Sequence, residues 1–283
     1  MTAPNPGLYL SGFPSGDHPL GTNEPTSAQG DGVTRHQNCQ TLESARQGNI
    51  RALAQLMTRA ENYAITEVDV ISPAAPDHPR TACTVIGLTG PPGVGKSTLI
   101  SCLIAEYRKR GQRVAVLCFD PSSPITGGAL LGDRIRMQEH SDDPGVFIRS
   151  VSSRGHLGGL SATARTMIAI LSEIEFDRIL IETVGTGQSE VEIASIADDT
   201  IVVLAPGAGD GIQMAKAGVL EIADLYVVNK ADQNGVHAVL RELQAVIELG
   251  QRDVPIVTTT ASRQEGAAEV VRALEAKRKS PMT

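Results

Sequence analysis

The feature that most constrains the fold is a glycine-rich stretch of nine residues, GPPGVGKST, from Gly90 to Thr98. It follows directly on a β-branched run, Thr84–Thr89, and precedes a helix-like stretch, LISCLIAEYRKR. The pattern G-x-x-x-x-G-K-[ST] between a strand and a helix is typical of a phosphate-binding loop. Its glycines let backbone N–H groups wrap phosphate oxygens, and the N-terminus of the helix adds favourable potential. We therefore expect a nucleoside triphosphate site at this point of the chain.

Each residue of this loop is expected to line the nucleotide. The positions are Gly90, Pro91, Pro92, Gly93, Val94, Gly95, Lys96, Ser97 and Thr98. Lys96 is expected to reach the β- and γ-phosphates and so to act in catalysis, and the Ser97 hydroxyl is expected to ligate Mg²⁺.

Further short runs of Val, Ile and Leu follow along the chain. They occupy residues 113–119, 146–151, 178–183, 200–205, 225–229 and 255–260. Apolar runs without alternation indicate strands that are covered on both faces, and the stretches between them supply crossover helices. The sequence therefore predicts an α/β fold with a doubly wound, mostly parallel sheet.

The ends of the chain differ from this alternating region. Residues 2–38 are crowded with Pro, Gly, Ser and Thr and show neither helical nor strand periodicity, which indicates a leader without regular structure. Apolar residues from Leu42 to Ala64 recur near helical spacing and predict an N-terminal helical extension. We expect a flexible leader at 1–40, a helical segment at 41–80 and a P-loop domain at 81–283 with one last helix near 266–279.

Composition excludes several classes of function. With 3% aromatic residues, no Trp and a formal charge of −7, the chain has little material for stacking bases or neutralising a phosphate backbone, so we expect no nucleic-acid partner. The cysteines stand far apart at Cys39, Cys83, Cys102 and Cys118. That spacing predicts free thiols rather than disulfides or a zinc site. No run approaches the roughly 18 apolar residues of a membrane span, so the expected localisation is cytoplasmic.

A second motif indicates which base the nucleotide carries. The stretch LYVVNKAD places Asn229, Lys230 and Asp232 at the end of a predicted strand, in the N-K-x-D arrangement of guanine-binding proteins. A carboxylate at Asp232 can accept from N1–H and from the exocyclic amine of guanine, whereas adenine offers no matching donors. After the last strand, Thr260 and Ala261 fit the weaker Ser/Thr-Ala segment that helps to hold the base.

Two acidic residues end strands between these motifs. Asp120 follows RVAVLCF, and Glu182 follows RILI in a stretch whose Gly185 completes an E-x-x-G variant of the D-x-x-G switch. Acids in these positions beside Ser97 can hold Mg²⁺ directly or through water and so contribute to catalysis. Either acid alone is also compatible with a helix cap or a solvated turn.

The chain resembles the MeaB/ArgK family of G-protein chaperones in five stretches: GPPGVGKST, FDPSSPITGGALLGDRIRM, IETVGTGQSE, PGAGDGIQMAKAG and NKAD. The similarity runs from near Ala45 to about Ala261. It implies a P-loop GTPase of the SIMIBI class that binds GTP and GDP with Mg²⁺. It also implies that this GTPase gates the loading of adenosylcobalamin into a B12-dependent acyl-CoA mutase such as methylmalonyl-CoA mutase, and protects that mutase. A cobalamin adenosyltransferase is the second partner that the resemblance suggests.

The resemblance also assigns residues to mobile loops. The positions matching its switch regions are Asp120, Asp133 and Arg136 in the first, Gln188 near the second, and Asp210, Gln213 and Lys216 in the third. Two features depart from the family pattern. Gly211 stands where an acidic residue is usual, and a single helix follows the last strand where the family has a long dimerising arm, which puts the homodimer in question.

Two other classes share parts of this pattern. A nickel-insertion GTPase would need soft ligands that converge on a metal. Cys118 and His156 are the candidates, and neither has a partner at ligand spacing. A kinase of the older ArgK type would need an ATP site and an acceptor-positioning base, against which the NKAD stretch argues.

Overall fold

A computed structural model of the chain describes residues 30–62, 65–66, 83–120, 137–152, 159–183, 192, 194–207, 220–250 and 253–279. Its helices are α1 (Gly30–Arg46), α2 (Ile50–Glu61), α4 (Lys96–Lys109), α6 (Gly159–Glu173), α8 (Val236–Gly250) and α9 (Ala267–Lys279), with short 3₁₀ turns η1 (Gln138–His140) and η3 (Ala261–Arg263). Its strands are β1 (Thr84–Thr89), β2 (Val114–Asp120), β3 (Val146–Ser152), β4 (Arg178–Thr183), β5 (Asp199–Leu204), β6 (Leu225–Val228) and β7 (Ile256–Thr258).

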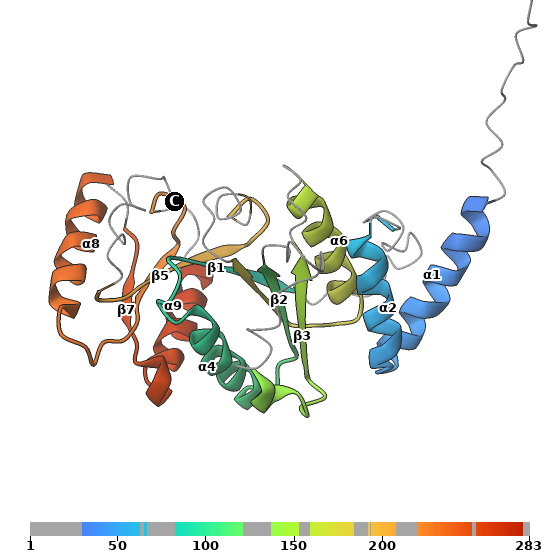
Figure 1. Ribbon diagram of the computed structural model, residues 1–283, viewed down its shortest axis with the longest axis horizontal. Helices are drawn as coiled ribbons and strands as arrows, with labels where there is room; N and C mark the ends of the chain where they lie inside the picture. Colours follow the sequence, from blue (N-terminus) through green and yellow to red (C-terminus); the bar gives the residue numbers. More distant parts are fainter. Residues whose placement is uncertain are drawn as a thin grey trace, which may run out of the picture.

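In the described part of the chain, the seven strands form one sheet in the order β3-β2-β4-β1-β5-β6-β7, and every neighbouring pair is parallel. Helices lie against both of its faces (Figure 1). This arrangement confirms the predicted doubly wound parallel α/β fold. The chain moves from β4 on one side of the central strand β1 to β5 on the other side, so the carboxyl end of β1 lies where the winding reverses. Ligands of open parallel sheets bind at this kind of point.

Alternate side chains of the strands point to opposite faces of the sheet and enter separate apolar clusters. Ile86 and Leu88 of β1 pack with α4 and α9, whereas Val85 belongs to the cluster under α1, α2 and α6. A third cluster joins β5 and β6 to α8. Strands buried on both faces need apolar residues at successive positions, which explains why the runs in the sequence do not alternate.

The prediction of an irregular leader through residue 38 was wrong over its last part, because α1 begins at Gly30. The stretch GDGVTRHQN has little helical periodicity, but contacts further along hold the helix. Leu42 and Ala45 are buried, and the buried Asn38 accepts a hydrogen bond from Arg59 of α2. Tertiary packing here overrides weak local propensity.

The two N-terminal helices are attached to the sheet domain by ion pairs. Arg46 at the end of α1 lies 2.6 Å from Glu173 of α6. Glu61 at the end of α2 lies 2.6 Å from Arg149 and accepts the backbone N–H of Ser152 at 3.2 Å, so it reaches the carboxyl end of β3. The helical segment therefore packs against the sheet domain, while the predicted domain boundaries stay a prediction.

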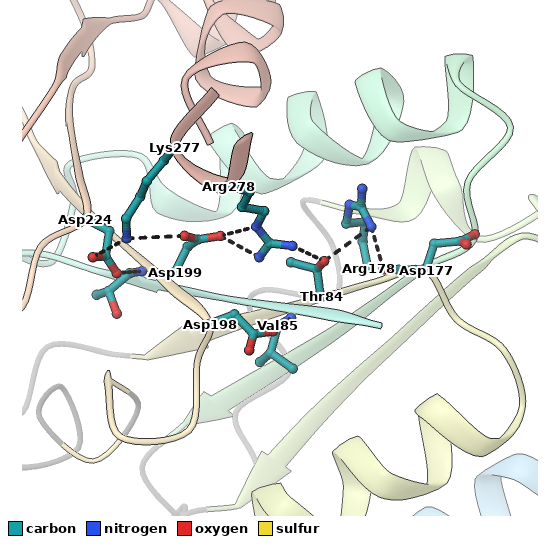
Figure 2. A network of polar contacts seen from close by, with 10 residues as sticks. Thr84, Val85, Asp177, Arg178, Asp198, Asp199, Asp224, Lys277 and Arg278 are labelled. Carbon is teal, nitrogen blue, oxygen red and sulfur yellow. Dashed lines mark hydrogen bonds and ion pairs between the residues drawn. The ribbon is translucent and has the colours of Figure 1, made fainter. Parts of the chain in front are cut away.

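Aspartates line the amino ends of the strands (Figure 2). Asp198 Oδ2 accepts the backbone N–H of Val85 at 2.8 Å, and Asp224 Oδ2 accepts that of Thr200 at 2.9 Å. Each carboxylate thus accepts a hydrogen bond from a backbone N–H near the start of a neighbouring strand. Such N–H groups need a partner when they are shielded from water. The two bonded residues, Val85 and Thr200, are the second residues of β1 and β5.

The last turn of α9 is tied to the same edge. The Asp199 side chain is 3% exposed and lies 2.5 Å from Arg278 and 3.5 Å from Lys277. Arg278 also donates to the Thr84 hydroxyl, and Lys277 lies 2.5 Å from Asp224 (Figure 2). This network lies at the amino ends of the strands. The predicted site lies at the opposite side of the sheet, where the described strands have their carboxyl ends.

Candidate nucleotide-binding site

The glycine-rich loop follows directly on the central strand. Gly90 has φ +139°, and a Cβ built there would lie 2.1 Å from the carbonyl oxygen of Val203 in β5. Only glycine allows the loop to leave β1 so close to the neighbouring strand. The loop ends at Gly95, and α4 begins at Lys96, so backbone N–H groups of the first turn of α4 face the loop. The predicted order of strand, loop and helix is therefore present.

Lys96 is folded back over this loop. The residue is 6% exposed, and its Nζ donates to the carbonyl oxygens of Gly90 at 2.8 Å and Pro91 at 3.1 Å. These contacts place the ammonium group inside the curve of the loop rather than in solvent. A cation there is well placed to meet phosphate oxygens.

Next to the loop, a hydroxyl meets a carboxylate. Ser97 Oγ in the first turn of α4 donates to Glu182 Oε1 at 2.8 Å, and Glu182 is 3% exposed near the end of β4. Hard oxygen donors of this kind suit Mg²⁺. The Cys118 thiol lies 3.9 Å from Glu182 Oε2 because the two residues are opposite each other in paired strands. Asp120 ends β2 at the same edge.

Asn229 connects the two predicted motifs. It is 3% exposed, and its Nδ2 donates to the carbonyl oxygen of Val94 in the phosphate loop at 2.9 Å. Its Oδ1 accepts the Thr259 hydroxyl and the Ala261 backbone N–H, each at 3.0 Å. One amide therefore holds the phosphate loop, the end of β6 and the loop after β7 together.

Gly95 makes room for this amide. It has φ +97°, and a Cβ built there would lie 2.4 Å from Asn229 Nδ2. The conformation and the contact both require glycine. The third glycine of the motif thus serves the packing between the loops as well as the bend of the phosphate loop.

Lys230 and Asp232 follow on the same turn. Lys230 has φ +56°, which is uncommon for a residue with a side chain, and its Nζ donates to the carbonyl oxygen of Gly93 at 2.7 Å. The Asp232 carboxylate is 30% exposed and lies 3.6 Å from Arg263 of η3. Asp232 is thus partly exposed and lies next to a cation.

Thr260 and Ala261 are buried next to these residues, and one contact there was not foreseen. Cys102 of α4, expected only to be a free thiol, has Sγ 3.2 Å from the Ala261 carbonyl oxygen and donates to it. Burial, with a smaller contribution from Glu139, raises the pKa of the Cys102 thiol. The sequence carries no motif for this contact because it depends on how η3 packs on α4.

Most of the predicted switch residues lie outside the described residues, and so does His156. These switch residues are Gly185, Gln188, Asp133, Arg136, Asp210, Gln213 and Lys216. Directly after the first predicted switch, Met137 is buried, and both Glu139 and His140 bond to Ser101 of α4. The described end of that stretch is thus attached to the helix that begins at the phosphate loop.

No helix in the described part of the chain has the length and apolar character to cross a lipid bilayer. In the same residues, no three His, Cys, Asp or Glu side chains converge to hold a metal ion.

The chain matches known proteins over most of its length. Residues 53–282 match the family described as methylmalonyl-CoA mutase-associated GTPase MeaB. A protein of Pyrococcus abyssi named as a GTPase is 47% identical over 238 residues, which are 81% of this chain and 72% of that protein. GTPase ArgK of Escherichia coli is 40% identical over 200 residues, 68% of this chain and 59% of its own length. The mouse mitochondrial methylmalonic aciduria type A homolog is 46% identical over 147 residues, 52% and 35% of the two chains.

Solved structures share this fold. The structure named LAO/AO transport system kinase superposes with a TM-score of 0.64 at 26% identity, covering 86% of this chain and 75% of its own. HypB of Helicobacter pylori in complex with nickel has a TM-score of 0.53 at 19% identity, covering 72% and 92%, and shares the fold alone. The match over residues 53–282 together with the identity to the Pyrococcus protein shows that this chain belongs to the MeaB family of methylmalonyl-CoA mutase-associated GTPases.

Proposed function

We propose that this GTPase gates the loading of adenosylcobalamin into a B12-dependent acyl-CoA mutase and protects that mutase. Family membership supports the mutase as partner, since the family takes its description from association with methylmalonyl-CoA mutase. The observation that carries the nucleotide part is the Asn229 amide, whose hydrogen bonds join the phosphate loop to the loop after β7. These bonds support a site in which phosphate recognition and base recognition are structurally linked.

At the phosphate end, we assign three roles in the proposal. Lys96 neutralises charge on the β- and γ-phosphates, while Ser97 and Glu182 hold Mg²⁺, with Asp120 reaching it directly or through water. The oxygen pair of Ser97 and Glu182, 2.8 Å apart, supports this assignment. When bound, the metal supplies charge stabilisation to the transferring phosphoryl group. The protein holds the nucleotide in the geometry that the reaction requires.

At the base end, Asp232 accepts from N1–H and the exocyclic amine of guanine, and the Lys230 stem lies along the base. The bond from Lys230 to Gly93 supports this orientation, because it joins the Lys230 side chain to the phosphate loop. Thr260 and Ala261 complete the base pocket through the bond between Ala261 and Asn229. GDP and GTP share this half of the site.

The predicted switch loops couple the nucleotide state to the mutase. Asp133 and Arg136 belong to the first switch, Gly185 and Gln188 lie in or near the second, and Asp210, Gln213 and Lys216 report nucleotide state to the mutase. A cobalamin adenosyltransferase is the proposed source of the cofactor. Coupling requires that the mutase contact these loops differently in the GTP and GDP states.

Stimulated hydrolysis tests the proposal. The kcat of GTP hydrolysis is measured for the chain alone and with excess adenosylcobalamin-dependent methylmalonyl-CoA mutase. We expect a rise of at least about tenfold, because a partner that completes the site lowers the barrier by about 1.4 kcal/mol or more. An acyl-CoA enzyme that does not use B12 is the control and should have no effect. An unchanged kcat with the mutase would contradict the proposal.

A triple variant tests the transmitter loop. Replacing Asp210, Gln213 and Lys216 by Ala should leave GTP affinity within about threefold, since the phosphate and base contacts stay intact. The same variant should lose both mutase-stimulated hydrolysis and nucleotide control of cofactor transfer. Stimulation equal to that of the unmodified chain would rule out this loop as the transmitter.

A further inference from the structure

The carboxylate assigned to guanine already has an intramolecular partner. Arg263 Nη2 lies 3.6 Å from Asp232 Oδ2, with the two side chains 62% and 30% exposed. The pair therefore lies at the surface rather than in the core. The separation is longer than a charge-assisted hydrogen bond of about 2.8 Å, as expected for a weak and reversible ion pair.

Rigid loops bring the two side chains together. The Arg263 backbone N–H donates to Thr260 at 2.8 Å, and Gln264 adopts a left-handed conformation with φ +59°. On the other side, Ala231 N–H donates to Thr259 at 3.0 Å, within the turn that presents Asp232. Because the backbone on each side is held, the guanidinium needs only side-chain freedom to reach the carboxylate.

The chemistry of the two groups suggests what the pair does. Guanine offers Asp232 two N–H donors on one planar N–C–N unit, namely N1–H and the exocyclic amine. An arginine guanidinium offers the same planar arrangement of donors to a carboxylate. We propose that Arg263 occupies Asp232 in the nucleotide-free protein as an internal substitute for the guanine edge, and that the incoming nucleotide displaces it. This inference rests on the proposed role of Asp232 in base recognition.

The effect on affinity has a definite sign and size. Binding of GDP must break the ion pair, so Arg263 weakens GDP binding and accelerates its release. For an exposed pair we expect a factor of about two to five in Kd, equivalent to about 0.4–1 kcal/mol. Salt screens exposed charges, so the factor should shrink as ionic strength rises. An arginine that instead helped to hold the base would have the opposite sign.

The test is titration calorimetry of the full chain with GDP and Mg²⁺. Arg263→Ala and Arg263→Gln should each bind GDP about two- to fivefold more tightly than the unmodified chain, at low salt and less so at high salt. The matched control is Arg272→Ala. Arg272 is 65% exposed in α9 and pairs with Glu269 at 2.5 Å, so it gives the same change of charge away from the base site. Thermal melting checks that each variant is folded.

A double-mutant cycle that combines Arg263→Ala with Asp232→Asn distinguishes the role of Asp232 in base recognition from the displacement of Arg263. If Asp232→Asn leaves GDP affinity unchanged, the role of Asp232 in base recognition fails. If Asp232→Asn weakens GDP but both Arg263 variants match the Arg272 control or bind more weakly, only the displacement of Arg263 is overturned. Tightening by Arg263→Ala that disappears in the Asp232→Asn background supports the inference, because it shows that Arg263 acts through this carboxylate.

Discussion

At the scale of single residues, the Asn229 amide shows why the site is compact. Asn229 itself follows β6, and its bonds reach Val94 in the loop after β1 and Thr259 and Ala261 in the loop after β7. The sequence motifs named Asn229 and Ala261 as site residues, and the structure places them within one hydrogen-bond network. Two further contacts had no motif. The bond from Thr259 to Asn229 depends on the pairing of β6 with β7, and the bond from Cys102 to Ala261 depends on how η3 packs on α4.

Gly95 offers a direct test of this network. Gly95→Ala forces a Cβ to within 2.4 Å of Asn229 Nδ2 in a left-handed backbone conformation. We expect GTP affinity to fall at least about tenfold, about 1.4 kcal/mol, because the amide must move. Calorimetry with GTP measures the loss. The control is Gly111→Ala, where φ is also positive but no atom lies within 4 Å of the added Cβ. Equal affinity in the two variants would contradict the packing argument.

Thiol reactivity tests the burial of the cysteines. Cys39 is exposed, whereas burial raises the pKa of the Cys83 thiol from 9.0 to about 12. At neutral pH the thiolate fraction of Cys83 is therefore ~1,000-fold lower than that of a thiol with the ordinary pKa, since each pKa unit is tenfold. Because thiolate is the reactive form, iodoacetamide should label Cys39 first, and Cys83 and Cys102 slowly. Peptide mass spectrometry measures the order, and similar rates in the native and urea-unfolded chains would contradict it.

At the scale of elements, the strands were predicted closely and the N-terminus was not. β1 and β4 begin and end at the residues expected, because each is a run of apolar residues buried on both faces. β7 is shorter than expected, Ile256–Thr258, since Thr259 and Thr260 turn into the base loop. The contact between α1 and α2 at Asn38 and Arg59 is tertiary, and local periodicity does not report it.

The attachment of α9 should contribute to stability. Arg278→Met leaves the Asp199 side chain, 3% exposed, with only the longer 3.5 Å contact to Lys277 among its ion pairs in the described residues. We expect the free energy of unfolding to fall by about 1–3 kcal/mol. The control Arg272→Met removes an exposed pair and should cost at most about 1 kcal/mol. Urea denaturation compares them, and equal losses would show that the network in Figure 2 does not stabilise the fold.

The end of α4 supplies a pH-dependent contact. Arg108 binds both carboxylate oxygens of Asp143, at 2.8 and 2.9 Å, and these hydrogen bonds lower the pKa of Asp143 below its ordinary value of 3.8. A lowered folded-state pKa gives stability that is present above the unfolded pKa and lost as pH falls through the folded one. Asp143 is 32% exposed, so screening limits the gain to about 1 kcal/mol.

Asp143→Asn should therefore reduce the melting temperature at pH 7, and the difference from the unmodified chain should narrow as the pH falls below 3.8. Thermal melts at a series of pH values measure this difference. A gap that stays constant with pH would show that Arg108 does not favour the ionised form of Asp143.

At the scale of the whole molecule, parallel pairing brings together residues that are distant in sequence. The P-loop after β1, Glu182 at the end of β4 and Asn229 after β6 meet at one edge because every described strand has its carboxyl end there. That grouping follows from sequence once a parallel sheet is predicted. The family similarity adds the mutase as the proposed partner, and the domain boundaries at residues 40 and 80 stay a prediction.

Nucleotide-dependent association with the mutase tests the central claim most directly. Calorimetry would titrate adenosylcobalamin-dependent methylmalonyl-CoA mutase with the full chain bound to GDP or to a non-hydrolysable GTP analogue. If nucleotide state controls cofactor loading, the two affinities should differ by at least about tenfold, about 1.4 kcal/mol, since a switch can act only through differential binding. Equal affinities in the two nucleotide states, or no binding in either, would contradict the account.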